Sequence, residues 1–194
     1  CLLHSYVFEG HEKTIKSFLQ KRYPKHFICI SSELAPLERE YERTTTVAAN
    51  AYVAPIMKDY IEKLAVTLQK SALNIMGSAG GLLPVERIIQ EPVHTLLSGP
   101  AGGVRGAWEA GRRCQRKKLL TLDMGGTSTD IALVQDNLKP KNEASLENLP
   151  LRIPFLPIET IGAGGGSIAH VDSGGTLRVG PQSAGAEPGP AAYG

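Results

Sequence analysis

The sequence predicts an α/β fold, because strand-like and helical patterns alternate from its start. Residues 1–7 and 26–31 are short apolar stretches typical of buried strands, and residues 11–23 between them place apolar side chains at helical spacing. This order predicts a parallel sheet with helices on its faces. Two later apolar stretches, residues 119–122 and 131–134, are partly β-branched and predict two further strands.

The middle of the chain predicts mainly helices. Residues 32–46 are polar and predict a short helix or a loop. Apolar positions in residues 47–68 recur at intervals of three and four, which predicts a long amphipathic helix packed on a core and kinked or restarted at Pro55. The elements expected next are a strand at 73–76, a glycine loop at 77–81, a short helix at 84–90 and a helix within 97–110.

The last third of the chain predicts short strands and glycine loops. Residues 136–151 are polar and predict a surface connection, and "VDSGGTL" predicts a hairpin turn. Short strands are expected at 158–161, 167–172 and 176–179. Because the composition changes near residue 118, we expect two lobes, 1–118 and 119–194.

The composition excludes several classes of protein. Hydrophobic residues make up 42% of the chain and charged residues 21%, which is typical of a soluble globular protein. A net charge of +2 argues against a nucleic-acid or membrane partner, and the basic run at 112–118 is typical of a helix end followed by a connector. Three scattered cysteines indicate neither disulfides nor zinc and favour the cytoplasm. No signal peptide or run of ~18 apolar residues is present, and the abrupt ends suggest a piece of a longer protein.

The stretch "LLTLDMGGTSTDIALV" is the strongest candidate for a functional site. Asp123 ends the first predicted strand and Asp130 begins the second, with small residues between them. Glycines let backbone N–H groups approach a phosphate closely, hydroxyls donate hydrogen bonds to it, and carboxylates bind Mg²⁺, usually through water. A Gly-Gly hairpin turn without any ligand explains the same residues. The residues that this motif adds to the two aspartates are Gly125, Gly126, Thr127, Ser128 and Thr129.

A second glycine-rich motif runs from Gly162 to Ser167, with Gly164, Gly165 and Gly166 between them. It is not a dinucleotide-binding fingerprint, because Ser167 stands where a glycine is needed and no helix follows. The motif indicates a loop where the backbone passes close to a ligand or to another strand.

A third motif, "SGPAGG", opens a predicted helix and contains Ser98, Gly99, Gly102 and Gly103. The N–H groups of a helix start favour anions, but small residues also allow close packing, and the sequence does not separate the two. His94 and His170 lie near glycine loops in the sequence, as candidates for acid–base groups or for structural histidines.

Taken in order, these motifs resemble a known family. A helix, a basic connector and an Asp-x-Gly-Gly-Thr turn resemble the two-lobed fold of sugar kinases, actin and the heat-shock ATPases, with ribonuclease H-like sheets and flanking helices. The closer resemblance is to the hydantoinase A / 5-oxoprolinase family, whose segments are similar to "SSELAPLEREYERTTT", "NAYVAPIM", "TLLSGPAGGV", "DMGGTSTDIALV", "IGAGGGSIAHVDSGGTLRVGP" and "SAGAEPGPAAYG".

The resemblance implies an ATP-dependent enzyme that opens cyclic amides such as hydantoins and 5-oxoproline, together with a hydantoinase B-type subunit or domain. Residues 123–130 would be the second of two phosphate loops, and residues 162–167 would line the nucleotide. Phosphorylation of the amide oxygen would create a better electrophile, with Asp123 or Asp130 holding Mg²⁺ or orienting the attacking oxygen. Two alternatives stay open: a ketone carboxylase subunit, and a nucleotide-regulated binding module without substrate chemistry.

The chain departs from the family pattern at three places. It has only one copy of the Asp-x-Gly-Gly-Thr loop, so we expect the first phosphate loop to lie elsewhere and residues 1–194 alone to be inactive. Ala79 stands where the family tends to have asparagine, which puts any amide contact there in doubt. Ala192 stands where the family tends to have cysteine, which excludes a role for that thiol.

Overall fold

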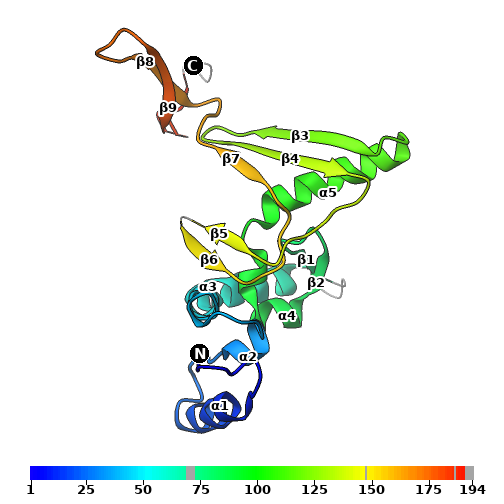
Figure 1. Ribbon diagram of the computed structural model, residues 1–194, viewed down its shortest axis with the longest axis vertical. Coiled ribbons are helices and arrows are strands. Elements are labelled where there is room, and N and C mark those ends of the chain that lie inside the picture. Colours follow the sequence, from blue (N-terminus) through cyan, green and yellow to red (C-terminus); the bar gives the residue numbers. More distant parts are fainter. Residues whose placement is uncertain (69–72, 147, 186, 191–194) are drawn as a thin grey trace. The chain divides into compact units, whose positions relative to one another are not determined.

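The computed structural model describes residues 1–68, 73–146, 148–185 and 187–190. The chain forms two compact units (Figure 1). The first unit is Cys1–Gly102 with Pro140–Leu156, and the second unit is Gly103–Lys139 with Pro157–Gly194. The boundary between two lobes at residue 118 stays a prediction. In the described ranges, no helix combines the length and the apolar character that a membrane span requires.

The first unit is mainly helical. Its helices are α1 (Gly10–Arg22), α2 (Ser31–Leu34), α3 (Glu40–Thr67), α4 (Val85–Gln90) and the 3₁₀ helix η1 (Pro92–Thr95). Two antiparallel pairs accompany them: β1 (Asn74–Met76) with β2 (Leu82–Pro84), and β5 (Ala144–Leu146) with β6 (Leu149–Leu151). The helices predicted at 11–23 and 84–90, the strand at 73–76 and the loop at 77–81 are confirmed.

Two predicted strands are wrong. Residues 1–7 form turns and residues 26–31 run without a partner strand, although both stretches are apolar. A strand requires its backbone groups to be paired, and no described segment pairs with either stretch. The parallel sheet inferred from them is wrong for the same reason, since every strand pair in the described ranges is antiparallel.

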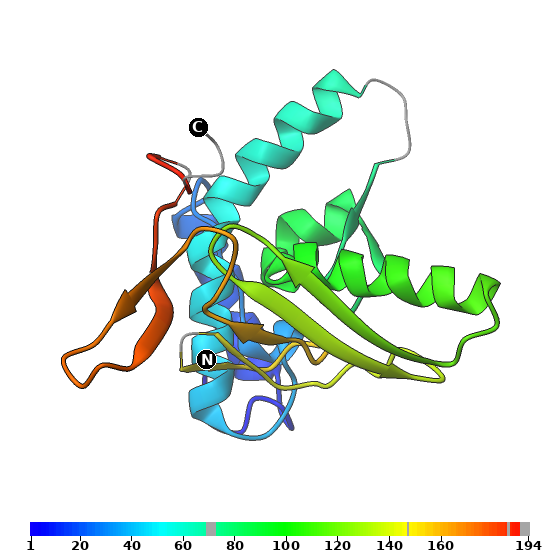
Figure 2. The ribbon, with the colours of Figure 1, turned by 90° about the horizontal axis from the view of Figure 1, so that it is seen from above.

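Helix α3 is longer than predicted and buries a different face. It continues through Pro55, and Figure 2 shows it as a long helical ribbon. The predicted core positions Tyr52, Ile56 and Tyr60 are exposed, whereas Ile61 is buried. The other buried positions of the helix are Arg43, Thr46, Asn50 and Ala54, so its buried stripe is mostly polar. Hydropathy therefore located the helix but not the face that packs.

Residues 136–151 are not only a surface connection, as predicted. The β5–β6 hairpin within them places Ala144 and Leu151 in the core of the first unit, against Leu34, Val93 and Ile153. Arg152 N donates a 2.8 Å hydrogen bond to the Thr46 hydroxyl of α3. The polar sequence concealed this role because only alternate residues of such short strands face the core.

The second unit is built on a three-stranded antiparallel sheet in the order β3–β4–β7 (Figure 1). The strands are β3 (Lys118–Met124), β4 (Thr129–Gln135) and β7 (Glu159–Ile161). Helix α5 (Ser98–Arg113) packs against β3, where a Cβ on Gly111 would lie only 2.5 Å from Leu119. The strands predicted around the "DMGGTSTD" turn are therefore confirmed.

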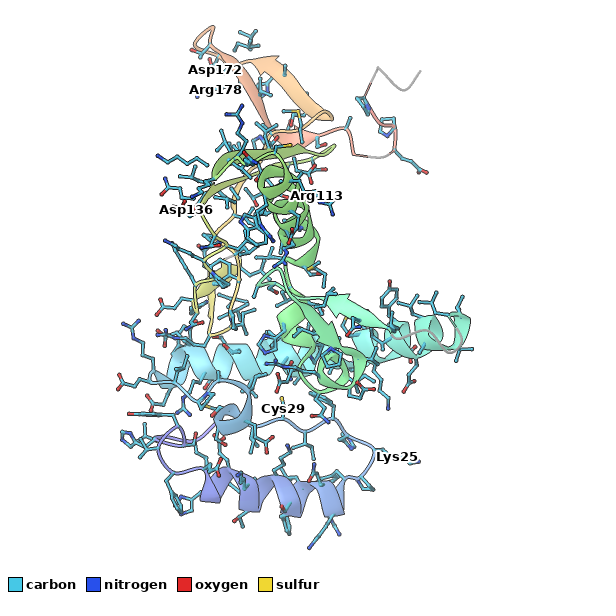
Figure 3. The ribbon with its side chains drawn as sticks, turned by 90° about the vertical axis from the view of Figure 1, so that its right-hand side faces the viewer. Lys25, Cys29, Arg113, Asp136, Asp172 and Arg178 are labelled. Carbon is cyan, nitrogen blue, oxygen red and sulfur yellow. The ribbon has the colours of Figure 1, made fainter. Side chains whose placement is uncertain are left out.

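A second hairpin completes this unit, with strands β8 (Ser167–Val171) and β9 (Leu177–Ser183). Its turn is held by Asp172, whose Oδ1 accepts hydrogen bonds from the N–H groups of Gly174 and Thr176. The Thr176 N–H is the main reason why the pKa of Asp172 is lowered, followed by the 3.0 Å bond from Arg178 Nε. Figure 3 shows Asp172 and Arg178 side by side on this hairpin, which confirms the predicted turn.

Candidate functional site

The predicted phosphate loop is a tight turn between β3 and β4. Gly125 N donates a 2.9 Å hydrogen bond to Ser128 O, which closes the turn. Gly125, Gly126 and Thr127 are exposed. Within the described part of the chain, the N–H groups of Gly126 and Thr127 donate no hydrogen bond. The turn therefore offers free backbone donors of the kind that bind anions.

The two aspartates of the motif lie directly opposite each other. Asp123 of β3 pairs in register with Asp130 of β4, so both side chains are on one face of the sheet. Opposite residues in an antiparallel pair have Cβ atoms about 5 Å apart, and two like charges at this spacing repel. The Asp123 carboxylate also lies close to α5, since a Cβ on Gly103 would be 3.9 Å from its Oδ2.

The third strand contributes a residue that sequence reasoning missed. Thr160 of β7 is paired in register with Asp130, and its hydroxyl donates a 2.6 Å hydrogen bond to Asp130 Oδ1. No other described group donates a hydrogen bond to either aspartate side chain. The only available sequence signal was that Thr160 lies two residues before the second glycine motif.

The second glycine motif packs directly on the first. Gly165 N donates to Gly125 O at 2.9 Å, and Gly166 N donates to Gly126 O at 2.6 Å. A Cβ on Gly164 would lie 2.6 Å from Gly125 O and 2.8 Å from Ser128 N. The backbones of the two loops are thus in contact, and the structure brings together two motifs that lie about 35 residues apart in the sequence.

Two hydroxyls of the predicted site fix these loops in place. The buried Thr129 donates a 2.6 Å hydrogen bond to Ala163 O, and Ser167 Oγ accepts a 2.8 Å bond from Gly164 N. The hydroxyls of Thr127 and Ser128 form no hydrogen bond with described residues. Thr127 and Ser128 are therefore the hydroxyls that remain open to a ligand.

The "SGPAGG" residues are divided between the two units. Ser98, Gly99 and Gly102 belong to the first unit, and Gly103 belongs to the second, next to Asp123. A part for Ser98, Gly99 and Gly102 in ligand binding stays a prediction.

The two candidate histidines have different surroundings. His94 is 6% exposed, and its Nε2 lies 3.2 Å from Glu91 Oε2, which also accepts a 2.9 Å bond from Arg87. The hydrogen bond from His94 is the main cause of the lowered pKa of Glu91. His94 lines a cavity of about 120 Å³ beside the 77–81 loop of the first unit. His170 is exposed on β8, opposite Arg178, so no described carboxylate orients it.

A magnesium site would have to rest on few protein ligands. No group of three or more metal-ligating side chains exists among the described residues. Mg²⁺ is often held by one or two carboxylates while water and phosphate supply the remaining ligands. Asp123 and Asp130 match that requirement because they are adjacent, on one face, and retain three carboxylate oxygens without a hydrogen bond to any described residue.

The chain resembles known proteins along nearly its whole length. A family model described as hydantoinase/oxoprolinase matches residues 43–194. Caprolactamase subunit alpha of Pseudomonas jessenii is 36% identical over 95% of this chain and 27% of its own length. 5-Oxoprolinase 1 of Arabidopsis thaliana is 36% identical over 99% of this chain and 15% of its own length.

Solved structures show the same relationship. The ATP-dependent caprolactamase from Pseudomonas jessenii matches with a TM-score of 0.81 and 36% identity, over 97% of this chain and 28% of that chain. Nucleotide-free acetone carboxylase matches with a TM-score of 0.75 and 30% identity, over 95% and 27%. The chain thus spans about a quarter of each solved relative and has its α/β fold. With a family model that matches most of its residues and relatives that agree in both sequence and structure, the chain belongs to the hydantoinase/oxoprolinase family.

Proposed function

We propose that the protein is an ATP-dependent hydrolase of cyclic amides, with the two packed glycine loops as part of its nucleotide site. The observation that carries the proposal is the pairing of the 125–128 turn with the 162–167 loop, beside two opposed carboxylates. The requirements of folding alone explain why the two loops pack closely. It does not explain free N–H groups, open hydroxyls and two adjacent carboxylates at one end of one sheet.

The residues would divide the work as follows. The N–H groups of Gly126 and Thr127, with the hydroxyls of Thr127 and Ser128, would bind phosphate oxygens of ATP. Gly162 and Gly165 would let the nucleotide approach the backbone, because a Cβ on Gly162 meets nothing within 4 Å and one on Gly165 is 3.7 Å from its nearest neighbour. The related caprolactamase is described as ATP-dependent, which supports ATP as the ligand.

Asp123 or Asp130 would hold Mg²⁺, directly or through water. When bound, this ion would neutralise charge on the phosphates and on the transferred group. It would also relieve the repulsion between the two carboxylates, which is a physical reason for their juxtaposition. The aspartate that does not bind the ion would orient the attacking oxygen.

ATP would make the ring amide reactive. An amide is a poor electrophile, and transfer of the γ-phosphoryl group of ATP to its oxygen, with release of ADP, would make the ring carbon a better electrophile. Water would then add to that carbon, the ring C–N bond would break with the proton going to the nitrogen, and hydrolysis would release the phosphate. Catalysis of such a transfer depends on positioning and charge neutralisation, which a rigid pair of loops can supply. Caprolactam, 5-oxoproline and hydantoins are the ring amides named for relatives or for the family.

The proposal is tested with the full-length protein and its partner subunit. ATP hydrolysis is measured with caprolactam, 5-oxoproline and hydantoin, each alone, and with the ring-opened products as controls. We expect phosphate release in proportion to the amount of one ring amide added. ATP turnover that no ring amide stimulates would contradict the proposal.

A second candidate is ATP-dependent carboxylation of a ketone. The match to acetone carboxylase supports it, but at lower identity and TM-score than the match to caprolactamase. A requirement for both bicarbonate and a ketone in the same assay would favour it. ATP turnover stimulated only by unfolded peptide would instead favour a nucleotide-regulated binding module and exclude both enzymes.

Two further features belong to the proposal. The name "subunit alpha" of the caprolactamase relative supports a partner subunit, which we propose to be of the hydantoinase B type. We also propose a cytoplasmic location, because the three cysteines are free in the structure. Copurification with the partner and fractionation of cells would test these two statements.

A further inference from the structure

Thr160 lies at the junction of the two predicted ligand-binding loops. Its strand, β7, pairs with β4 immediately beside Asp130 and then leads directly into the second glycine loop, where Ala163 N bonds to Ile161 O at 2.8 Å. Its hydroxyl is exposed and donates to Asp130 Oδ1. One side chain therefore connects the carboxylate of the first loop to the strand that begins the second.

The hydrogen bond makes the two aspartates unequal. Asp130 Oδ1 is occupied by the Thr160 hydroxyl, and its Oδ2 has no hydrogen bond within the described residues. Asp123 has no such donor on either oxygen in the same part of the chain. A fixed hydroxyl on one carboxylate oxygen limits rotation of that group and directs its other oxygen to a single position.

We propose that Thr160 is a positioning residue that orients Asp130 for magnesium-ATP. The inference rests on the proposed function. It adds strand β7 to the site and gives the two aspartates different roles. Asp130 would be the aspartate held in fixed geometry, and Asp123 the one free to follow the ligand. Thr160 itself would touch neither the nucleotide nor the ring amide.

The main test variant is Thr160→Val in the full-length protein with its partner, which removes the hydroxyl and keeps the shape. We expect kcat to fall roughly 10-fold or more, the change for losing a hydrogen bond to a charged group. The concentration of Mg²⁺ for half-maximal rate should rise, whereas KM for the ring amide should stay within about two-fold. Thr160→Ser keeps the donor and should restore most of the rate.

Thr121→Val is the matched control. Thr121 is on β3, on the same face as Asp123 and two residues before it, but its hydroxyl bonds to the backbone of Ala132 rather than to a carboxylate. We expect this variant to keep kcat and its dependence on Mg²⁺ close to the wild type. The melting temperatures of all three variants are measured alongside.

Three results would overturn the inference: an unchanged Thr160→Val enzyme, equal losses in Thr160→Val and Thr121→Val, or a lost rate that Thr160→Ser does not restore. Each of these leaves the proposed function intact, since it is judged by ring-amide-dependent ATP turnover of the wild type. Absence of that turnover in the wild type would overturn the proposed function and this inference together.

Discussion

The contact between the two glycine loops predicts that Gly164→Ala damages the site, although the added methyl group is small. A Cβ at this position would lie 2.6 Å from Gly125 O, 2.8 Å from Ser128 N and 2.9 Å from Gly126 C. All three atoms are backbone, so no side chain can rotate away to make room. The loops would have to separate by several tenths of an ångström or more.

The magnitude follows from what that separation breaks. Overpacking of a close contact costs about 1–3 kcal/mol. The hydrogen bonds from Gly165 N and Gly166 N cross the same junction, and each contributes about 0.5–1.5 kcal/mol. We therefore expect a local destabilisation of about 2–4 kcal/mol, together with weaker binding of magnesium-ATP.

The assay is thermal unfolding of the full-length protein, with and without magnesium-ATP. Gly165→Ala is the matched control for stability, because its Cβ would lie 3.7 Å from Gly125 O, an ordinary contact. We expect Gly164→Ala to unfold at a lower temperature than Gly165→Ala, and to gain less stability from the nucleotide than the wild type does. Equal unfolding temperatures for the two variants would refute the reasoning from close packing.

Two further predictions concern Asp123, a carboxylate of the proposed site, and Glu12, a buried carboxylate that stabilises the fold. Asp123→Ala should lower ATP turnover about 100-fold or more. The melting temperature should stay within a few degrees of the wild type, because the Asp123 side chain accepts no hydrogen bond from described residues and faces a like charge. A large loss of stability would instead make Asp123 a structural residue. Burial would raise the pKa of Glu12, but hydrogen bonds from Ser32 N, Ser31, Leu2 N and Ser5 outweigh it and lower the pKa to about 2. A lowered folded-state pKa gives stability that is present above pH ~4.5 and lost as the pH falls toward ~2, at most about 3 kcal/mol. Glu12→Gln should therefore destabilise the protein at pH 7 and roughly half as much at pH 3, and an equal effect at both pH values would contradict this.

The sequence predicted best where local chemistry determines the structure. The β3–β4 turn was predicted from two glycines between β-branched stretches, and the β8–β9 hairpin from "VDSGGTL". Both depend on residues that are neighbours in the chain. The strands expected at 1–7 and 26–31 failed because a strand depends on a partner, and the pairing partner is not encoded in the stretch itself.

Helix α3 shows a second limit of sequence reasoning. Its buried face includes Arg43, whose guanidinium donates to Ser31 Oγ at 2.9 Å and to Leu2 O at 2.8 Å. It also includes Asn50, whose Nδ2 donates a hydrogen bond to Gln90 O and whose Oδ1 accepts one from Val93 N. A hydropathy pattern assigns such residues to solvent, because it does not register that a polar group can be buried once it is hydrogen-bonded. The partners of these two residues come from distant segments, so only the folded chain reveals the face.

The glycines of the second loop cannot be told apart in the sequence, yet the structure gives them different tasks. Gly164 and Gly166 face the first loop, where a Cβ would collide with backbone atoms of residues 125–128. Gly162 and Gly165 are exposed and would accept a Cβ without such a collision. Residues 164–167 form a turn, closed by a 3.0 Å hydrogen bond from Ser167 N to Gly164 O, which directs Gly164 and Gly166 toward the first loop and leaves Gly165 exposed. The inward glycines fix the two loops to each other, and only the outward side leaves room for a ligand to approach the main chain.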